Sequence, residues 1–330
     1  MRYLLRRASF YLVALWASVT FNFIIPRLMP GNPAEAYIAK VRANNVTPQL
    51  LHSLEAEFGV NTTVPIWQQY FNYLGQVLHG NLGIATSQFP QNVSTVLGRG
   101  LPWTIGLVGV SVILSFIIGT LIGMLIAWRR GSLLDTAIPS LLTFISAIPY
   151  FWMALGLIYI FAVVLNVLPN EGGYDIYGTA PGFNLPFILS AIHYGFLPVV
   201  TLVLGSLAGW VLTMRNMMVT TLAEDYVLMA QAKGLPERRV MFSYAARNAI
   251  LPSITSFSIS LGLVVSGALL TEMVFNYPGV GFYLYTAVQN SDYALVEGCF
   301  LVIALAVLIA NFLSELVYTL LDPRVRHGGN

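Results

Sequence analysis

Uncharged apolar stretches alternate with polar segments along the whole chain. A bilayer core about 30 Å thick requires roughly 20 apolar residues of α-helix, so each long stretch predicts a membrane-spanning helix. Six stretches have this character, at residues 8–26, 101–128, within 136–168, 196–214, 250–271 and 294–321. The pattern therefore predicts an all-α, polytopic membrane protein with six transmembrane helices.

The first apolar stretch has two interpretations. Arg2, Arg6 and Arg7 precede it, and residues 14–17 loosely resemble the cleavage site of a signal peptide. However, the run continues through residues 21–25, which makes it longer than the apolar core of a signal peptide. We therefore expect a retained transmembrane helix.

The distribution of Lys and Arg predicts the orientation of the chain. With the N-terminus in the cytoplasm, most of these residues lie on the cytoplasmic side: Arg2, Arg6, Arg7, Arg129, Arg130, Arg215, Lys233, Arg238, Arg239, Arg247, Arg324 and Arg326. Arg27, Lys40, Arg42 and Arg99 are spread over one long outer segment. Because short cytoplasmic loops carry the excess of Lys and Arg, both termini are expected in the cytoplasm.

Composition excludes several other classes of protein. Charged residues make up 9% of the chain, against roughly 25% in soluble domains, and the mean hydropathy is +0.73. Sparse Lys and Arg argue against a nucleic-acid partner. Cys299 is the single cysteine, and the four histidines have no metal-ligand spacing, so no bound metal is expected.

Prolines and acids inside the predicted spans are candidates for a pathway. Pro149, Pro198 and Pro252 each remove a backbone donor and are expected to bend or end a helix. Glu315 is the one acid deep in a predicted span, and Glu272 lies near an outer end. Charges in a membrane are costly, so each acid either has a structural partner or belongs to the pathway.

A pair of small residues predicts a close helix contact. Gly119 and Gly123 lie one turn apart in the second apolar stretch. Such a pair allows the backbone of another helix to approach closely.

The polar segment at residues 31–100 is expected outside the membrane. It predicts two helices, at residues 49–58 and 65–78. The segment is either a small cap on the membrane domain or a docking surface for a partner. The expected organisation is an N-terminal tail and first span (1–30), this outer segment, a membrane core (101–321) containing a cytoplasmic segment (222–249), and a C-terminal tail (322–330).

The cytoplasmic segment predicts two short helices joined by a turn. Glu224 and Asp225 stand at the start of the first helix, where the helix dipole favours acids. Gly234 is suited to end that helix in a left-handed conformation, and Pro236 to begin the second. An exposed apolar and basic face on this pair would fit the groove of a soluble partner; alternatively, the basic residues only satisfy topology.

Several blocks of the sequence resemble one family of permeases. Residues 226–252, YVLMAQAKGLPERRVMFSYAARNAILP, resemble the cytoplasmic signature of permease subunits of peptide-type ABC importers, the oligopeptide/dipeptide/nickel family. Residues 28–33, 79–83, 272–281 and 321–324 resemble further blocks of its first-permease (B-type) subunits. The chain departs from the family at Leu228 and Met229 (general importer motif Glu-Ala-Ala), at Asn32 (an acid), and at residues 291–294.

The resemblance implies a type I ABC importer permease fold and a docking role for the segment 222–249, called the coupling segment below. The residues expected to dock an ATPase are Glu224, Asp225, Tyr226, Met229, Ala230, Ala232, Lys233, Gly234, Leu235, Pro236, Arg238 and Arg239. Expected partners are a second permease, two ATPases that carry ATP and Mg, and an external substrate-binding protein. The chain has no phosphate-binding loop of its own, so no catalysis is expected in this subunit.

The expected location is the cytoplasmic membrane of a bacterium or archaeon. The expected cargo is oligopeptides or dipeptides, with cello- or chito-type oligosaccharides and nickel as alternatives. Tyr174, Tyr177 and Phe183 would suit an aromatic entrance for peptides or sugars alike. A stand-alone secondary transporter is the rival from another class, but it would need a coupling-ion site and usually an internal repeat.

Overall fold

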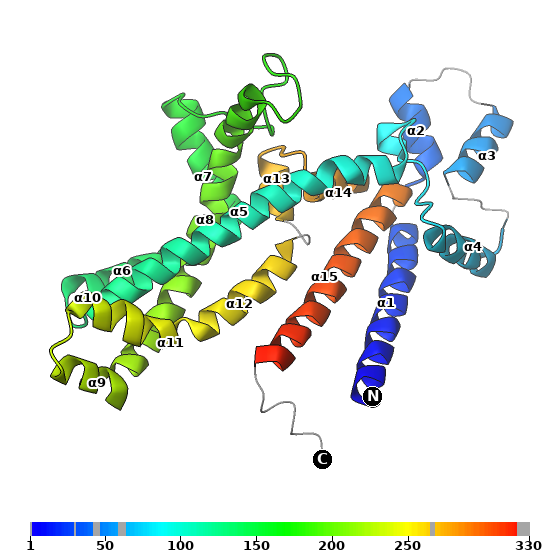
Figure 1. Ribbon diagram of the computed structural model, residues 1–330. Helices are drawn as coiled ribbons and strands as arrows, with labels where there is room; N and C mark the ends of the chain where they lie inside the picture. Colours follow the sequence, from blue (N-terminus) through cyan, green and yellow to red (C-terminus); the bar gives the residue numbers. More distant parts are fainter. Residues whose placement is uncertain (1, 30, 42–46, 59–63, 265–267, 322–330) are drawn as a thin grey trace. The chain divides into compact units, whose positions relative to one another are not determined.

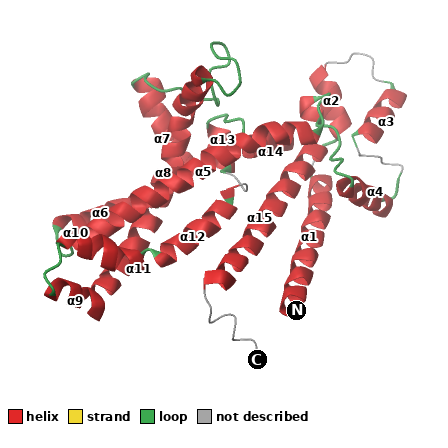
Figure 2. Cartoon of the chain, in the orientation of Figure 1, coloured by secondary structure: helices red, strands yellow, loops and turns green. Residues whose placement is uncertain are grey.

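The computed structural model describes residues 2–29, 31–41, 47–58, 64–264 and 268–321, and within them the chain is helical with no strand (Figure 2). The first helices are α1 (Arg2–Leu28), α2 (Pro33–Val41), α3 (Pro48–Glu57), α4 (Ile66–Leu78), η1 (Thr86–Gln88), α5 (Val93–Trp128), α6 (Leu133–Ser146), α7 (Tyr150–Leu157) and η2 (Ile158–Val164). The others are α8 (Leu185–Leu222), α9 (Asp225–Ala232), α10 (Glu237–Arg239), η3 (Val240–Ala246), α11 (Arg247–Ala249), α12 (Leu251–Gly262), α13 (Leu269–Val274), α14 (Val280–Gln289) and α15 (Tyr293–Leu321).

The chain divides into two compact units. Unit 1 comprises Met1–Ile105 and Val265–Ile309, and unit 2 comprises Gly106–Val264 and Ala310–Asn330. The long helices α5 and α15 contribute to both units. The predicted helices of the polar segment at 31–100 are confirmed as α3 and α4, and both belong to unit 1.

Among the described residues, four helices are long and apolar enough to cross a membrane, and a bent pair makes a fifth candidate. The four are Ser9–Leu28, Val93–Trp128, Leu185–Leu222 and Tyr293–Phe312, and the pair is Leu133–Ser146 with Tyr150–Val164. In the predicted span 250–271, α12 has 12 residues, about 18 Å of helix, and residues 265–267 lie outside the described part. The chain is thus an all-α, multi-pass membrane protein.

A proline accounts for the bend between α6 and α7. Pro149 stands directly before α7, and α6 is bent by 97° at this break relative to Tyr150–Val164, the helix formed by α7 and η2. Proline lacks an N–H group and disfavours helical backbone in the residue before it, so the predicted interruption at Pro149 is confirmed. By contrast, α8 continues through Pro198, and Pro252 lies in the first turn of α12.

In unit 1, α1 and α15 lie side by side and are joined by an ion pair (Figure 1). Arg27 near the end of α1 donates to Glu297 in the second turn of α15 and to the carbonyl of Phe23, whose ring it covers. Pairing satisfies both charges where little water reaches them. Sequence reasoning treated Arg27 only as a charge of the outer segment and did not find its partner.

In unit 1, the departure at Asn32 and the buried Asp292, which keeps the acid of the family's Asp-Tyr-Pro block, both have clear structural roles. The side chain of Asn32 accepts from the backbone N–H of Ala34 and donates to the carboxylate of Glu55, at 3.0 and 2.8 Å. An acid at position 32 could not make the second bond. Asp292 is buried, accepts from the N–H of Leu295 at the start of α15, and receives the hydroxyl and N–H of Ser87 at 2.7 and 2.8 Å.

Glu272 in α13 is fully buried against the beginning of α14. The Thr104 hydroxyl and the Gly281 N–H each donate to its carboxylate, at 2.8 and 2.7 Å. The same hydroxyl accepts from the N–H of Val280. Because the first N–H groups of a helix lack intrahelical partners, the carboxylate and hydroxyl together satisfy the N-terminus of α14.

In unit 2, α5 and α8 approach closely at the predicted glycine pair. A side-chain carbon on Gly119 would lie 2.4 Å from Cβ of Trp210, and one on Gly123 would lie 2.5 Å from the carbonyl oxygen of Val211. Neither distance is sterically possible. The prediction of a close contact at Gly119 and Gly123 is therefore confirmed, with α8 as the partner.

Gly123→Ala is expected to lower the melting temperature of the detergent-solubilised protein. The added methyl group forces α5 away from α8, and overpacking of this kind costs about 1–3 kcal/mol. Gly106→Ala is the matched control in the same helix, because a Cβ there meets nothing within 4 Å. Equal melting temperatures for the two variants would contradict the close contact.

Glu272→Gln is expected to destabilise the fold by about 1–3 kcal/mol, because the new amide places donor hydrogens against the donors of Thr104 or Gly281. Glu35→Gln removes the same charge from an exposed position and is expected to leave the melting temperature unchanged. Thermal unfolding of both variants measures the difference. An equal decrease in melting temperature for both variants would show that the loss of net charge, and not the buried hydrogen bonds of Glu272, causes the destabilisation.

Candidate functional site

The coupling segment folds back onto the ends of α5 and α8 in unit 2. Helices α9, α10 and α11 gather at the C-terminal end of α8 (Figure 1). A buried apolar cluster holds them there, and it consists of Met124, Ala127, Met214, Met218, Val227, Ala230, Val240, Met241, Ala245, Ala246 and Ala249. The segment is thus a packed part of the unit, and a force on it acts directly on α8.

The turn between α9 and α10 has the geometry that the sequence predicts. Gly234 has a φ of +72°, and its N–H donates to the carbonyl of Gln231 at 2.8 Å. The N–H of Leu235 donates to the carbonyl of Ala230 at 3.3 Å, which completes a Schellman motif. A Cβ on Gly234 would meet nothing within 4 Å, so the backbone conformation, rather than space, favours glycine here.

The segment has one face in the apolar cluster and one face in solvent. Val227 is fully buried, whereas the side chain of Met229 is 58% exposed. Of the residues expected to dock a partner, Ala230 is buried and Leu235 is half-buried. The other ten are exposed: Glu224, Asp225, Tyr226, Met229, Ala232, Lys233, Gly234, Pro236, Arg238 and Arg239.

The exposed face combines apolar side chains with charges of both signs. Its charged residues are Glu224, Asp225, Lys233, Glu237, Arg238, Arg239 and Arg247, and none of them forms an ion pair with another described residue. Tyr226 accepts a hydrogen bond from Asn248 at 2.8 Å, which ties α9 to the residues of α11. The charges of this face are therefore available to a partner.

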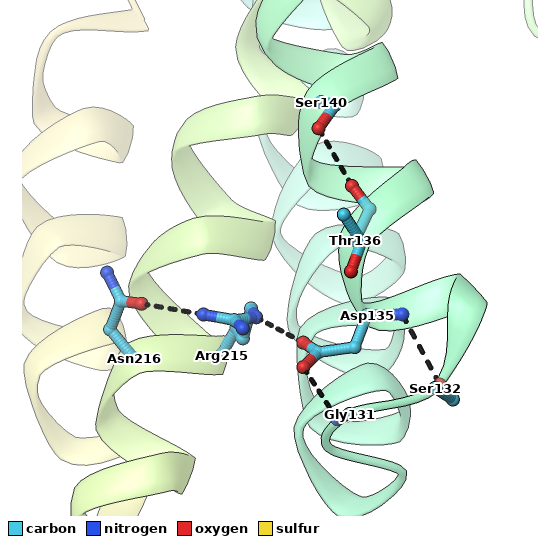
Figure 3. A network of polar contacts seen from close by, with 7 residues as sticks. All are labelled: Gly131, Ser132, Asp135, Thr136, Ser140, Arg215 and Asn216. Carbon is cyan, nitrogen blue, oxygen red and sulfur yellow. Dashed lines mark hydrogen bonds and ion pairs between the residues drawn. The ribbon is translucent and has the colours of Figure 1, made fainter.

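An ion pair lies next to this cluster and was missed by sequence reasoning. Arg215 on α8 donates to Asp135 on α6 at 2.6 Å, and the second carboxylate oxygen of Asp135 accepts from the N–H of Gly131 at 3.0 Å (Figure 3). Arg215 also donates to Asn216 at 3.4 Å. Since Met214 and Met218 of the cluster flank Arg215 on α8, the pair fixes α6 to α8 beside the coupling segment.

A local signal marks Asp135 in the sequence. Ser132 precedes α6, and its hydroxyl accepts from the N–H of Asp135. Ser-x-x-Asp before an apolar run is a variant of the capping box. The pattern identifies the start of the helix but not the partner on α8, which is 80 residues away.

The other candidate residues lie elsewhere. Glu272 belongs to unit 1 and Pro252 to unit 2. Glu315 is in α15, but its side chain lies outside the described residues. Tyr177 and Phe183 are fully exposed, whereas Tyr174 packs on Phe187 with ring centroids 5.1 Å apart.

Comparison with known proteins identifies relatives over the full length of the chain. A protein of Brucella suis biovar 1 named as a peptide permease is 35% identical over 326 residues, 99% of each chain. The di/tripeptide transport system permease protein DppB of Pseudomonas aeruginosa is 33% identical over 98% of each chain. The dipeptide transport system permease protein DppB of Escherichia coli K12 is 32% identical over 99% of each chain.

A family model agrees with these relatives. The model described as "Binding-protein-dependent transport system inner membrane component" matches residues 119–327, more than half of the chain. This match includes the coupling segment, α8 and the glycine pair of α5. The chain therefore belongs to the family of inner membrane components of binding-protein-dependent transport systems.

Proposed function

We propose that this chain is a permease subunit of an ATP-driven, binding-protein-dependent importer and forms half of the translocation pathway for oligopeptides or dipeptides. Relatives named as peptide, dipeptide and di/tripeptide permeases over the full length of the chain support the cargo class. Membership of a transport family supports a transport subunit rather than an enzyme. Oligosaccharides of the cello or chito type and nickel are the alternative cargoes.

In the proposed topology the chain crosses the membrane six times, with both termini in the cytoplasm, in the type I ABC importer fold. The four long helices and the bent pair supply five crossings, and the sixth is the span predicted from the sequence at residues 250–271, which contains α12. Five crossings would place the coupling segment and the C-terminal Arg324 and Arg326 on opposite sides. Six place both basic segments in the cytoplasm, as the excess of Lys and Arg favours.

The observation that carries the proposal is the two-faced coupling segment. Its buried face is anchored on α5 and α8 by the apolar cluster, while Tyr226, Leu228 and Met229 remain exposed. In water such side chains gain by burial against another protein, at about 25 cal/mol per Å² of apolar surface. An ATPase subunit docked on this face would bury them.

The packing also supplies a route for transmission. A displacement of α9 acts on α8 through Met214 and Met218, because close-packed interiors transmit strain. The pair between Asp135 and Arg215 would extend the motion to α6. Rigid-body movement of this kind switches transporters between inward and outward access.

The proposed assembly contains a second permease, two ATPases that bind ATP and Mg, and an external substrate-binding protein. The proposed location is the cytoplasmic membrane of a bacterium or archaeon. The segment 31–100 lies on the outer side in this topology, and the tail 322–330 lies in the cytoplasm. A stand-alone secondary transporter would instead work without ATPase partners.

Mass spectrometry of what copurifies with the tagged chain from its own membrane tests the assembly. A second permease and one or two ATPases are expected. The reconstituted assembly should then take up labelled dipeptide with ATP, and excess unlabelled peptide should compete whereas cellobiose, chitobiose or nickel should not. Recovery of the chain alone, with transport that continues without ATP, would overturn the proposal.

Met229→Asp is expected to weaken ATPase binding about tenfold or more, since it places a charge at the centre of the apolar docking face. The fold should remain intact because this side chain is mostly exposed. Met229→Leu keeps the apolar character and is the matched control. Equal ATPase binding by both variants, measured by pull-down from solubilised membranes, would contradict the docking role of this face.

A further inference from the structure

Helix α4 (Ile66–Leu78) has an amphipathic sequence without any charged residue. Trp67, Phe71, Leu74 and Leu78 follow at intervals of four, three and four residues, which places them on one face. The opposite face consists mainly of side-chain amides: Gln68, Gln69, Asn72 and Gln76. A helix with one apolar face must bury that face against something.

The apolar face of α4 is largely uncovered by the described residues of the cap. Trp67, Phe71 and Leu78 are 63%, 62% and 85% exposed, so the described residues of the cap leave the apolar face largely uncovered. Gln69, Asn72 and Gln76 instead line a cavity of about 490 Å³ together with Arg27 and Glu297. Gln68, Asn72 and Gln76 are themselves exposed, so the amide face borders this open cavity while the apolar face is directed away from it.

The contacts of α4 with α1 fix the level of α4 along the axis of α1. The Tyr70 hydroxyl forms a hydrogen bond with Thr20 at 2.8 Å, and the rings of Tyr70 and Tyr73 lie 5.3 and 5.5 Å from the ring of Phe23. Thr20 and Phe23 belong to the candidate span Ser9–Leu28. Along the axis they lie about 12 and 8 Å below Leu28, at 1.5 Å per residue.

The surface of α1 continues the apolar face of α4. Phe21, Ile24 and Ile25 are exposed on α1 at the same level as its contacts with α4, and Figure 1 shows α4 beside this end of α1 and running across it. Because a membrane-spanning helix has acyl chains around its exposed apolar residues, the same medium reaches a helix attached to it at that depth.

We propose that α4 is an interfacial helix, which lies at the boundary of headgroups and acyl chains in the leaflet at the C-terminal end of α1. Its apolar face (Trp67, Phe71, Leu74 and Leu78) contacts lipid, and Gln69, Asn72 and Gln76 border the open polar cavity. Tyr and Trp are enriched at this boundary, and amphipathic helices bind there through their apolar face. The proposal is independent of the cargo and requires only that α1 spans the membrane.

Site-directed spin labelling tests this placement in the intact importer, reconstituted in liposomes. Cys299 is the single cysteine, so Cys299→Ser provides a background for one new cysteine at a time. Phe71→Cys probes the apolar face, Asn72→Cys is its neighbour on the polar face, and Ile118→Cys is a reference within α5. Retained ATP-dependent uptake shows that each labelled variant is folded.

The readout is the collision rate of each label with oxygen, which concentrates in lipid, and with a water-soluble nickel complex. At position 71 the ratio of oxygen to nickel collisions is expected to be several-fold higher than at position 72 and lower than at position 118. Ratios typical of water at both 71 and 72 would overturn the proposal. A label at 71 that neither reagent reaches would also overturn it, because that result places a protein partner on this face.

Discussion

Transmission from the coupling segment to the membrane helices depends on its apolar contact with the end of α8. Met214 and Met218 are completely buried beneath Val227 and Val240, so the segment cannot move independently of the helix that it covers. A loosely attached loop could be displaced by a docked partner without moving α8. A close-packed segment transmits such a displacement to α8. The same packing leaves the opposite face of α9 exposed to a partner.

A second constraint appears at the helix ends. Asp135, Glu272 and Asp292 are buried carboxylates, and each is held by backbone N–H groups at or beside the start of a helix. Buried carboxylates and buried backbone N–H groups are both costly to leave unpaired where water is scarce. Each carboxylate also bonds a side chain from a distant part of the sequence, so it fixes the position of the helix as well as its beginning.

Periodic and local features could be predicted from the sequence, because one stretch of chain is sufficient to specify them. Helices α3 and α4, the interruption at Pro149 and the left-handed turn at Gly234 are examples. The length of α8 was underestimated: the apolar stretch 196–214 marks only its middle, while Leu185–Leu222 extends past it through Ser190 and His193 on one side and Arg215 and Asn216 on the other. Hydropathy reports solvent preference and not the extent of a helix.

Pairs between distant residues could not be predicted. Arg27 and Glu297, or Asp135 and Arg215, come from helices whose neighbours the sequence does not specify. For Gly119 and Gly123 a close contact was predicted, but α8 as the partner was known only from the structure. The helical spacing of Trp67, Tyr70, Phe71 and Leu74 likewise predicted a helix at α4, but not the orientation of its two faces.

The central claim is that the solvent-exposed face of α9 contacts an ATPase. Photo-crosslinking in intact cells tests it most directly, with a photoreactive amino acid in place of exposed Ala232 and, as a control, in place of Tyr177 in the loop before α8. If this face docks an ATPase, a crosslink is expected from position 232 to an ATPase subunit and none from position 177. A crosslink from position 232 to lipid alone, or the same ATPase crosslink from both positions, would contradict it.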